Sequence, residues 1–585
     1  IDALQRKDKG KGMYIVATVK EEARPVTDVL PEILSKLILS LNFPKSMRWG
    51  DSDFRFVRPI HWILSLYNNE KVIFEIRDLQ SGSTTRGHRF LSPASFEIKD
   101  TRAYINLLRN NYVILDPEER VRMILEGSNR LAASVNAVLV QDDELLNHVS
   151  FLIEYPVPVL GTFPVEYLAL PRELLITVMK GHQKYFALED RYGKLSNSFI
   201  IVSNTKPDNA ETVRRGAERV IKARFEDARF YFEEDRRAPL MERLEGLKKV
   251  IYHERLGSIH AKTLRIDSLA GFIAERCHPG RKEDIHTAAL LTKTDLISGV
   301  VREFPELQGI MGGYYARLEG YKEEVARAVS EHYRPAFSGD KVPETDIGAV
   351  VSLADKCDNL ASFFMIGLTP TGTEDPFALR RQALSSLAIL IQRKLDISLE
   401  EILFKALEPY SIDNRDAIVD QLIAFIAQRA EHYFQSEGFP PDAVAAVAGH
   451  LRNRPLHRVT ETLAALKTFR EDPGCAPFLL VMKRVNNIAP REEMPEVSPA
   501  LFVEDEERVL WERLGIAKTG LPAAIASHDD KAAIDLLATL QEPVNMFFDK
   551  VLIMDKRDEV KRNRLSLLRQ IQAVSLQVAD FSKLS

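Results

Sequence analysis

The sequence has few cysteines and no long apolar run, and each scarcity excludes a class of protein. Only three of its 585 residues are cysteine, and none forms a C-x-x-C pair. A disulfide framework and a zinc knuckle are therefore not indicated. No uninterrupted apolar stretch reaches the ~20 residues of a membrane-spanning helix, and no secretory signal opens the chain. We expect a cytoplasmic protein without a membrane partner.

Common catalytic signatures are also missing. There is no G-x-S-x-G nucleophile elbow and no H-E-x-x-H zinc motif. The segment GLTPTGTE (367–374) has the two glycines of a phosphate-binding loop, but Thr373 stands where the essential lysine would be. We interpret this segment as a turn. The sequence thus predicts no catalytic residue, no metal ligand and no cofactor bound by this chain.

A chain of this length contains about three to five domains of ordinary size. In residues 1–237 the sequence predicts amphipathic helices, such as PEERVRMILEGSNRLAASV (117–135), and β-branched strands, such as KVIFEIRDL (71–79) and PVPVLGTF (156–163). A mixed α/β region is therefore predicted there. In 238–397 and 398–585, apolar residues recur at three- and four-residue steps, which predicts two helical regions. The fold class is therefore multidomain α+β. The chain does not begin with Met, and we expect the natural N-terminus to lie upstream.

The segment AALLTKTDL (288–296) resembles the helix of HD-superfamily metal phosphohydrolases, which ends in AALLHD. Thr292 and Lys293 replace the His and Asp that would hold the metal, and a lysine repels a divalent cation. The central region is therefore predicted as an HD-like helical domain without metal. One alternative stays open, a metal-dependent phosphohydrolase that uses His260, Asp295 and Asp355 in a rearranged site.

Because the net charge is −5, RNA could dock only where cations gather locally. The helix near the C-terminus has the densest run of cations, and RRGAERVIKAR (214–224) places several on one helical face. TRGHRFL and MKGHQKYF combine cations, imidazole and an aromatic ring, which suit phosphate contact and base stacking. The alternative, equally compatible with the residues, is a solvated helix face paired to its own Asp and Glu and two ordinary polar loops. The candidate RNA contacts are Lys556, Arg557, Lys561, Arg562, Arg564, Arg569, Arg86, His88, Lys180, His182, Lys184, Arg215, Arg219 and Lys222.

Five longer motifs occur in an order that resembles one family over essentially the whole chain. They are MRWGDSDFRFVRPIHWIL (47–64), TRGHRFL (85–91), VMKGHQKYFAL (178–188), LADKCDNLASFFMIGLTPTGTEDPFALRRQAL (353–384) and FFDKVLIMDKRDEVKRNRLSLL (547–568). Together they are similar to the β subunit of bacterial heterotetrameric glycyl-tRNA synthetase. The opening segment of that family, which contains EIGTEELP, is absent from this sequence.

The resemblance implies a tRNA-binding subunit of an α2β2 ligase. The class II active site, where ATP with Mg²⁺ and glycine form the adenylate, would lie on the α subunit, and the C-terminal helices would form a DALR-like anticodon-binding domain for tRNA(Gly). The sequence agrees on one point, because it contains neither H-I-G-H, nor K-M-S-K-S, nor G-x-G-x-x-R. A stand-alone RNA-binding protein remains a further alternative.

Overall fold

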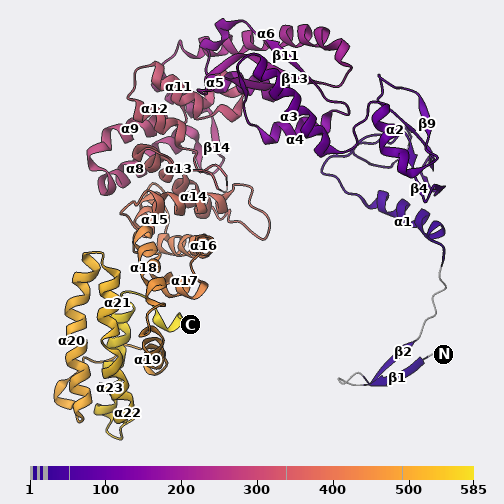
Figure 1. The fold of residues 1–585 in the computed structure, drawn as a ribbon. Coiled ribbons are helices and arrows are strands. Elements are labelled where there is room, and N and C mark those ends of the chain that lie inside the picture. The colour runs from indigo at the N-terminus through magenta and orange to yellow at the C-terminus, as the bar shows by residue number, and fades with distance from the viewer. Residues whose placement is uncertain (1–3, 9–12, 18–23, 52, 338, 491) are drawn as a thin grey trace. The chain divides into compact units, whose positions relative to one another are not determined.

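The computed structural model describes residues 4–8, 13–17, 24–51, 53–337, 339–490 and 492–585 (Figure 1). The chain divides into two compact units, Ile1–Arg229 and Phe230–Ser585. The first unit mixes strands with helices, and the second is almost entirely helical. This order confirms the predicted multidomain α+β class with helical regions toward the C-terminus. The predicted boundaries near residues 237 and 397 remain predictions.

A four-stranded antiparallel sheet forms the main core of the first unit, with the strand order β10-β12-β13-β11. Phe186 of β12 pairs with Ile200 of β13, and both side chains are buried together with Ile124 of α3 and Val149 of α4. Helix α3 is well specified by its sequence, because Pro117 occupies the first turn and the Asp116 side chain accepts from the backbone N–H of Glu118.

A second part of the first unit consists of short strands. Val72, Phe74 and Ile76 form a small core there, and one side of helix α1 packs against it. The predicted single strand over 71–79 is instead interrupted between β5, β6 and β7, because Arg77 adopts a positive φ of 54° in the turn that joins β6 to β7. Farther along, β8 pairs with β9 in antiparallel register, and Thr85 lies opposite Phe96.

The second unit is organised around helix α13 (Asp346–Met365), which is buried along most of its length because apolar and small residues occur on all its faces. Helices α8, α9, α12, α14 and α15 pack against it. Near the C-terminus, α20 packs against α21, α22 and α23, and α19 packs against α22 and α23 (Figure 1). Among the described residues, no helix is both long and apolar enough to cross a membrane.

The elements of the two units have the following bounds. The strands of the first unit are β1 (Leu4–Asp8), β2 (Met13–Ala17), β3 (Ile63–Leu64), β4 (Leu66–Tyr67), β5 (Glu70–Lys71), β6 (Glu75–Ile76), β7 (Leu79–Gly82), β8 (Thr84–Arg86), β9 (Ser95–Glu97), β10 (Val138–Leu139), β11 (Val157–Thr162), β12 (Phe186–Glu189) and β13 (Leu195–Ser203). Its helices are α1 (Val26–Ser40), α2 (Tyr104–Asn110), α3 (Pro117–Ser134), α4 (Asp143–Leu152), α5 (Arg172–Gly181) and α6 (Ala210–Asp235), the last continuing into the second unit. The second unit has one hairpin, β14 (Ile251–His253) and β15 (Gly257–Ser258), and the helices α7 (Leu240–Gly246), α8 (Ile259–Cys277), α9 (Lys282–Leu291), α10 (Gly299–Glu303), α11 (Ile310–Leu318), α12 (Glu323–Glu331), α13 (Asp346–Met365), α14 (Leu379–Gln392), α15 (Leu399–Leu407), α16 (Arg415–Ser436), α17 (Pro441–Val447), α18 (Leu456–Phe469), α19 (Cys475–Ile488), α20 (Asp505–Ala526), α21 (Asp530–Ala538), α22 (Gln541–Lys550) and α23 (Asp558–Ser575).

Candidate functional site

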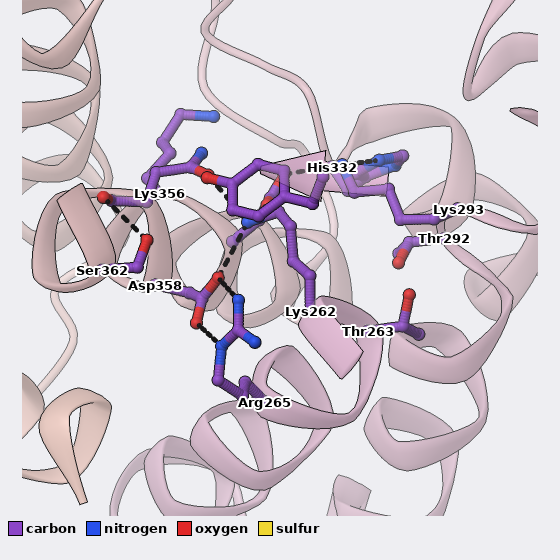
Figure 2. A network of polar contacts seen from close by, with 12 residues as sticks. Lys262, Thr263, Arg265, Thr292, Lys293, His332, Lys356, Asp358 and Ser362 are labelled. Atoms are coloured by element: carbon purple, nitrogen blue, oxygen red, sulfur yellow. Dashed lines mark hydrogen bonds and ion pairs between the residues drawn. The ribbon is translucent and has the colours of Figure 1, made fainter. Parts of the chain in front are cut away.

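A network of charged side chains is buried where α8 meets α13. Asp355 and Asp358 are three residues apart on α13 and therefore face the same side of that helix. The Lys262 ammonium on α8 contacts both, 2.7 Å from Asp355 Oδ1 and 2.9 Å from Asp358 Oδ2. Arg265, one turn farther along α8, donates its Nε to Asp358 Oδ1 at 2.6 Å, and Figure 2 shows two contacts between these side chains. These buried pairs join the two helices.

Lys293 is the second counter-ion of Asp355. Its Nζ lies 2.7 Å from Asp355 Oδ2 and 3.0 Å from Nε2 of His332, and all three residues are buried. The other ring nitrogen of His332 lies 2.6 Å from the carbonyl oxygen of Val329, so Nδ1 carries the proton and Nε2 accepts from the ammonium. Burial holds the pKa of His332 well below its ordinary value, which keeps the ring neutral. Although burial opposes ionisation, Lys262 and Lys293 hold the pKa of Asp355 well below its usual range.

The Lys293 ammonium therefore takes the place between a carboxylate and an imidazole that a metal ion would need. Both oxygens of Asp355 already face lysines, so a divalent ion would have to displace a fixed positive charge. The preceding Thr292 is also buried, and its hydroxyl donates to the carbonyl of Ala289 rather than facing a ligand. The residues present do not fit a metal centre.

The rearranged metal site of the phosphohydrolase alternative is not assembled. His260 Nε2 lies 3.6 Å from Glu245 Oε1. Asp295 Oδ2 accepts the backbone N–H groups of Gly309 at 2.6 Å and Gly312 at 2.9 Å, so it fixes the start of α11. No group of three His, Cys, Asp or Glu side chains in the described ranges is arranged to hold a metal. This geometry argues against the alternative.

The predicted RNA contacts near the C-terminus lie on α23 and in the segment just before it. Lys556 and Arg562 are exposed and Lys561 is partly exposed, and none of these three pairs with a carboxylate in the part of the chain that the structure describes. Arg557 is exposed but binds Asp555 with Nη2 2.9 Å from Oδ2, and Arg569 donates to the Gln572 amide. Three cations in this segment are thus available to an anionic partner.

Arg564 corrects the sequence prediction, because it is an interior residue. Only 2% of its side chain is exposed, and its Nε and Nη2 each donate to Glu507 of α20 at 3.0 Å. Its Nη1 donates to the carbonyl oxygen of Leu552. Since Glu507 is fully buried as well, this bidentate pair connects α20 with α23 and cannot reach RNA. Arg562 is two residues before Arg564, so helical spacing places it on the opposite, exposed side of α23. Lys561 is three residues before Arg564, nearer the buried face, and is only partly exposed.

The predicted contacts in the first unit differ in how much of their charge is neutralised. Lys180 lies 2.8 Å from Asp142 Oδ2 and 3.0 Å from Glu144 Oε2, and Arg215 lies 2.7 Å from Glu211. Because these cations already have carboxylate partners, less of their charge is available to a phosphate. The other members are Lys184, which donates to the Gly181 carbonyl, and His182, Arg219 and Lys222, which are exposed.

His88 is the second correction, because only 1% of it is exposed. Its Nδ1 accepts the backbone N–H groups of Phe90 and Leu91 at 3.3 and 3.2 Å, so the ring shapes the loop instead of contacting a ligand. Arg86 is exposed, and its guanidinium lies 5.4 Å from the ring centroid of Trp62. The list of predicted contacts names neither Trp62 nor Phe90, although Phe90 is the aromatic ring of the TRGHRFL motif.

The sequence prediction also missed Lys262 and Arg265. The only local signal was two cations three residues apart on a helix that is otherwise buried, and their acidic partners lie more than 90 residues away. The buried cations hold helices together. Exposed cations without an ion-pair partner in the described residues, such as Lys556 and Arg562, are the kind of group that a protein binding an anionic macromolecule would offer.

Comparison with known proteins identifies the family. The family model "Glycyl-tRNA synthetase beta subunit" matches residues 1–449, and the model "DALR anticodon binding domain" matches residues 479–577. The glycine–tRNA ligase beta subunit of Thermodesulfovibrio yellowstonii is 44% identical, over 100% of this chain and 85% of that protein. The beta subunit of Syntrophus aciditrophicus is 42% identical, over 98% of this chain and 84% of that protein. This chain belongs to the glycyl-tRNA synthetase beta subunit family.

Proposed function

We propose that this chain is the tRNA-binding subunit of a glycine–tRNA ligase, and that it holds tRNA(Gly) while a separate α subunit catalyses glycylation. The observation that carries the proposal is the unpaired cation group at the start of α23, Lys556, Lys561 and Arg562, inside the segment that matches the anticodon-binding domain. A net-acidic chain repels a polyanion except at such places.

The surface beside these cations also suits an unpaired RNA loop. In the segment between α22 and α23, Leu552 and Met554 are 70% and 59% exposed. Arg484 lies with its guanidinium 4.4 Å from the ring centroid of Phe548 on α22. Unpaired bases bind to apolar, aromatic and guanidinium surfaces, while the cations contact phosphates. We therefore assign the anticodon stem-loop to α23 and the segment before it.

The chemical step belongs to the α subunit in this proposal, because the sequence carries no adenylation signature. ATP with Mg²⁺ would be used there, in an α2β2 assembly in the cytoplasm. The β chain alone should not catalyse glycine-dependent ATP–pyrophosphate exchange. Robust exchange by highly purified β chain would show that the division of labour is wrong.

The test replaces Lys561 and Arg562 by Ala together and measures tRNA(Gly) binding by the α–β complex over a salt series. Each lost contact to a single strand should lower the salt slope by about 0.7, so the double variant should lose about 1.4. A matched control, Lys467→Ala with Arg513→Ala, removes the same charge from exposed positions of α18 and α20.

The double variant at 561 and 562 should also keep its helical content and leave adenylate formation by α unchanged, because both side chains lie outside the helical core. Unchanged tRNA binding and salt slope would refute the assignment of α23. If the parent chain binds tRNA in the absence of the α subunit and the double variant loses that binding, the result would instead support a stand-alone RNA-binding protein. Copurification with the α subunit separates these readings.

A further inference from the structure

The loop Arg86–Phe90 in the first unit exposes the ring of Phe90 to solvent, while buried contacts fix the backbone of the loop. Phe90 is 81% exposed, although phenylalanine is ordinarily a core residue. The Arg89 guanidinium lies 5.9 Å from its ring centroid. Three residues before Arg89 in the same loop, Arg86 lies with its guanidinium 5.4 Å from the ring centroid of Trp62. Trp62 is 44% exposed and is fixed by a hydrogen bond from its Nε1 to Thr85 Oγ1 at 3.2 Å. We call Trp62, Arg86, Arg89 and Phe90 the aromatic–arginine surface.

The base of this loop is fixed by buried contacts. As described above, the His88 ring lies inside and accepts the N–H groups of Phe90 and Leu91. Its own backbone N–H donates to the carbonyl of Asn111 at 2.9 Å. Gly87 lies so close that a Cβ there would be 2.7 Å from the same carbonyl oxygen, which excludes any larger residue without a shift. The loop is thus preorganised, which lowers the entropy cost of binding.

The charge of this surface is available. Within the described part of the chain, neither Arg86 nor Arg89 forms an ion pair with a carboxylate, whereas Lys180 and Arg215 of the same unit do. Two exposed rings with two unneutralised guanidinium groups match a ligand that offers flat bases and phosphates together. An apolar protein patch would match the rings but would leave the guanidinium groups without anions.

We propose that the aromatic–arginine surface binds the unpaired 3′ end of the tRNA, with a base stacked on Phe90 and phosphates contacted by Arg86 and Arg89. This inference rests on the proposed function, and it adds a second RNA contact distinct from α23. If α23 takes the anticodon loop, the 3′ end is the remaining long unpaired segment of a tRNA. Sequence-tolerant stacking on an aromatic side chain is the usual mode for single strands.

The experiment uses the α–β complex and tRNA(Gly) with 2-aminopurine in place of its terminal adenosine, because stacking quenches this base. Phe90→Ala should weaken binding of intact tRNA by roughly 5- to 150-fold, the range for one lost base–aromatic stack, and should reduce the quenching. Phe90→Trp should preserve both, since it keeps the stacking face. Arg86→Ala with Arg89→Ala should lower the salt slope by about 1.4.

Tyr192 provides the matched control, because it is 80% exposed and Arg191 lies 4.9 Å from its ring centroid. Tyr192→Ala should leave tRNA binding and quenching unchanged. A tRNA shortened by its unpaired 3′ nucleotides should bind the parent and Phe90→Ala complexes equally. If Phe90→Ala weakens the intact and shortened tRNAs alike, or neither, the inference is wrong.

Two further readouts keep this inference separate from the proposed function. If Phe90→Ala loosens the α–β complex on size exclusion and leaves quenching intact, the surface is a protein contact and the inference is overturned. The shortened tRNA should still lose affinity when Lys561 and Arg562 are replaced. That loss would support the α23 assignment even where the Phe90 result is negative.

Discussion

Replacing Lys293 by Met should locally destabilise the central helices by about 3 kcal/mol. The Lys293 ammonium lies 2.7 Å from Asp355 Oδ2, 3.0 Å from His332 Nε2 and 3.9 Å from the ring centroid of Tyr333. Only 3% of the residue is exposed, so water cannot take its place. Removing one member of a buried pair costs about 3–5 kcal/mol, because the remaining charge is left without compensation. Asp355 keeps Lys262 at 2.7 Å, which places the loss at the lower end of that range.

Native-state hydrogen exchange of the α13 amides is the suitable assay, because a multidomain chain has no single unfolding free energy. An opening cost lower by about 3 kcal/mol corresponds to roughly 150-fold faster exchange in the equilibrium-limited regime. Lys356 offers a matched control on the same helix. It is equally buried, but its ammonium donates to Ser352 Oγ and the Tyr333 carbonyl, and among the described residues it forms no ion pair with a carboxylate. Burial lowers its pKa to about 8.

Lys356→Met should therefore change the opening cost by less than about 1 kcal/mol, or raise it, because no carboxylate loses its partner. Equal exchange rates in the Lys293→Met variant and the parent would refute the reasoning that Lys293 is the counter-ion of Asp355. Binding of one equivalent of manganese, iron or zinc by the parent, lost when Asp355 is replaced, would refute it independently.

Three other positions give separate tests. Burial raises the pKa of Asp295 to about 6. The stability that this group contributes is therefore fully present below about pH 4 and is lost as the pH rises through 6. Asp295→Asn should flatten this decline when thermal unfolding is measured against pH, and an unchanged profile would contradict the assignment. Gly87→Ala should weaken tRNA binding as Phe90→Ala does, because its Cβ would lie 2.7 Å from the Asn111 carbonyl oxygen and would shift the loop that carries Phe90. An affinity equal to that of the parent would show that the loop tolerates the shift. Arg564→Ala should cost about 3–5 kcal/mol in urea unfolding of the C-terminal helices, since it strands buried Glu507; a change under 1 kcal/mol would contradict the buried pair.

Local sequence signals were sufficient to predict helix α3. The helix predicted over 117–135 is observed at Pro117–Ser134, because an N-cap Asp, a proline in the first turn and a regular apolar spacing all act locally. The strand predicted over 71–79 was wrong as a single element. Its composition favours extended structure throughout, but a β6–β7 turn with Arg77 at positive φ depends on pairing between the strands, which composition does not reveal.

Predictions about the charged residues have the same limit, because they also depend on contacts between elements far apart in the sequence. A run of cations in the sequence does not tell which of them is neutralised, because the partner comes from another element. Arg562 and Arg564 are two residues apart, yet Arg564 is buried in an ion pair with Glu507 of α20, whereas Arg562 is exposed to solvent. Likewise, the pairing of Lys262 with Asp355 and Asp358 depends on how α8 packs against α13. Only the tertiary structure separates cations that hold the fold from cations that can bind RNA.

The position of Lys293 between Asp355 and His332 also affects how the central region becomes folded. A metal ion has to be captured from solution, so its occupancy follows its concentration and the protonation of its ligands. A lysine is part of the chain, and the backbone brings it to Asp355 whenever α9 and α13 pack together. This region can therefore complete its charge balance during folding without any supply of divalent ions, and chelators should leave its stability unchanged.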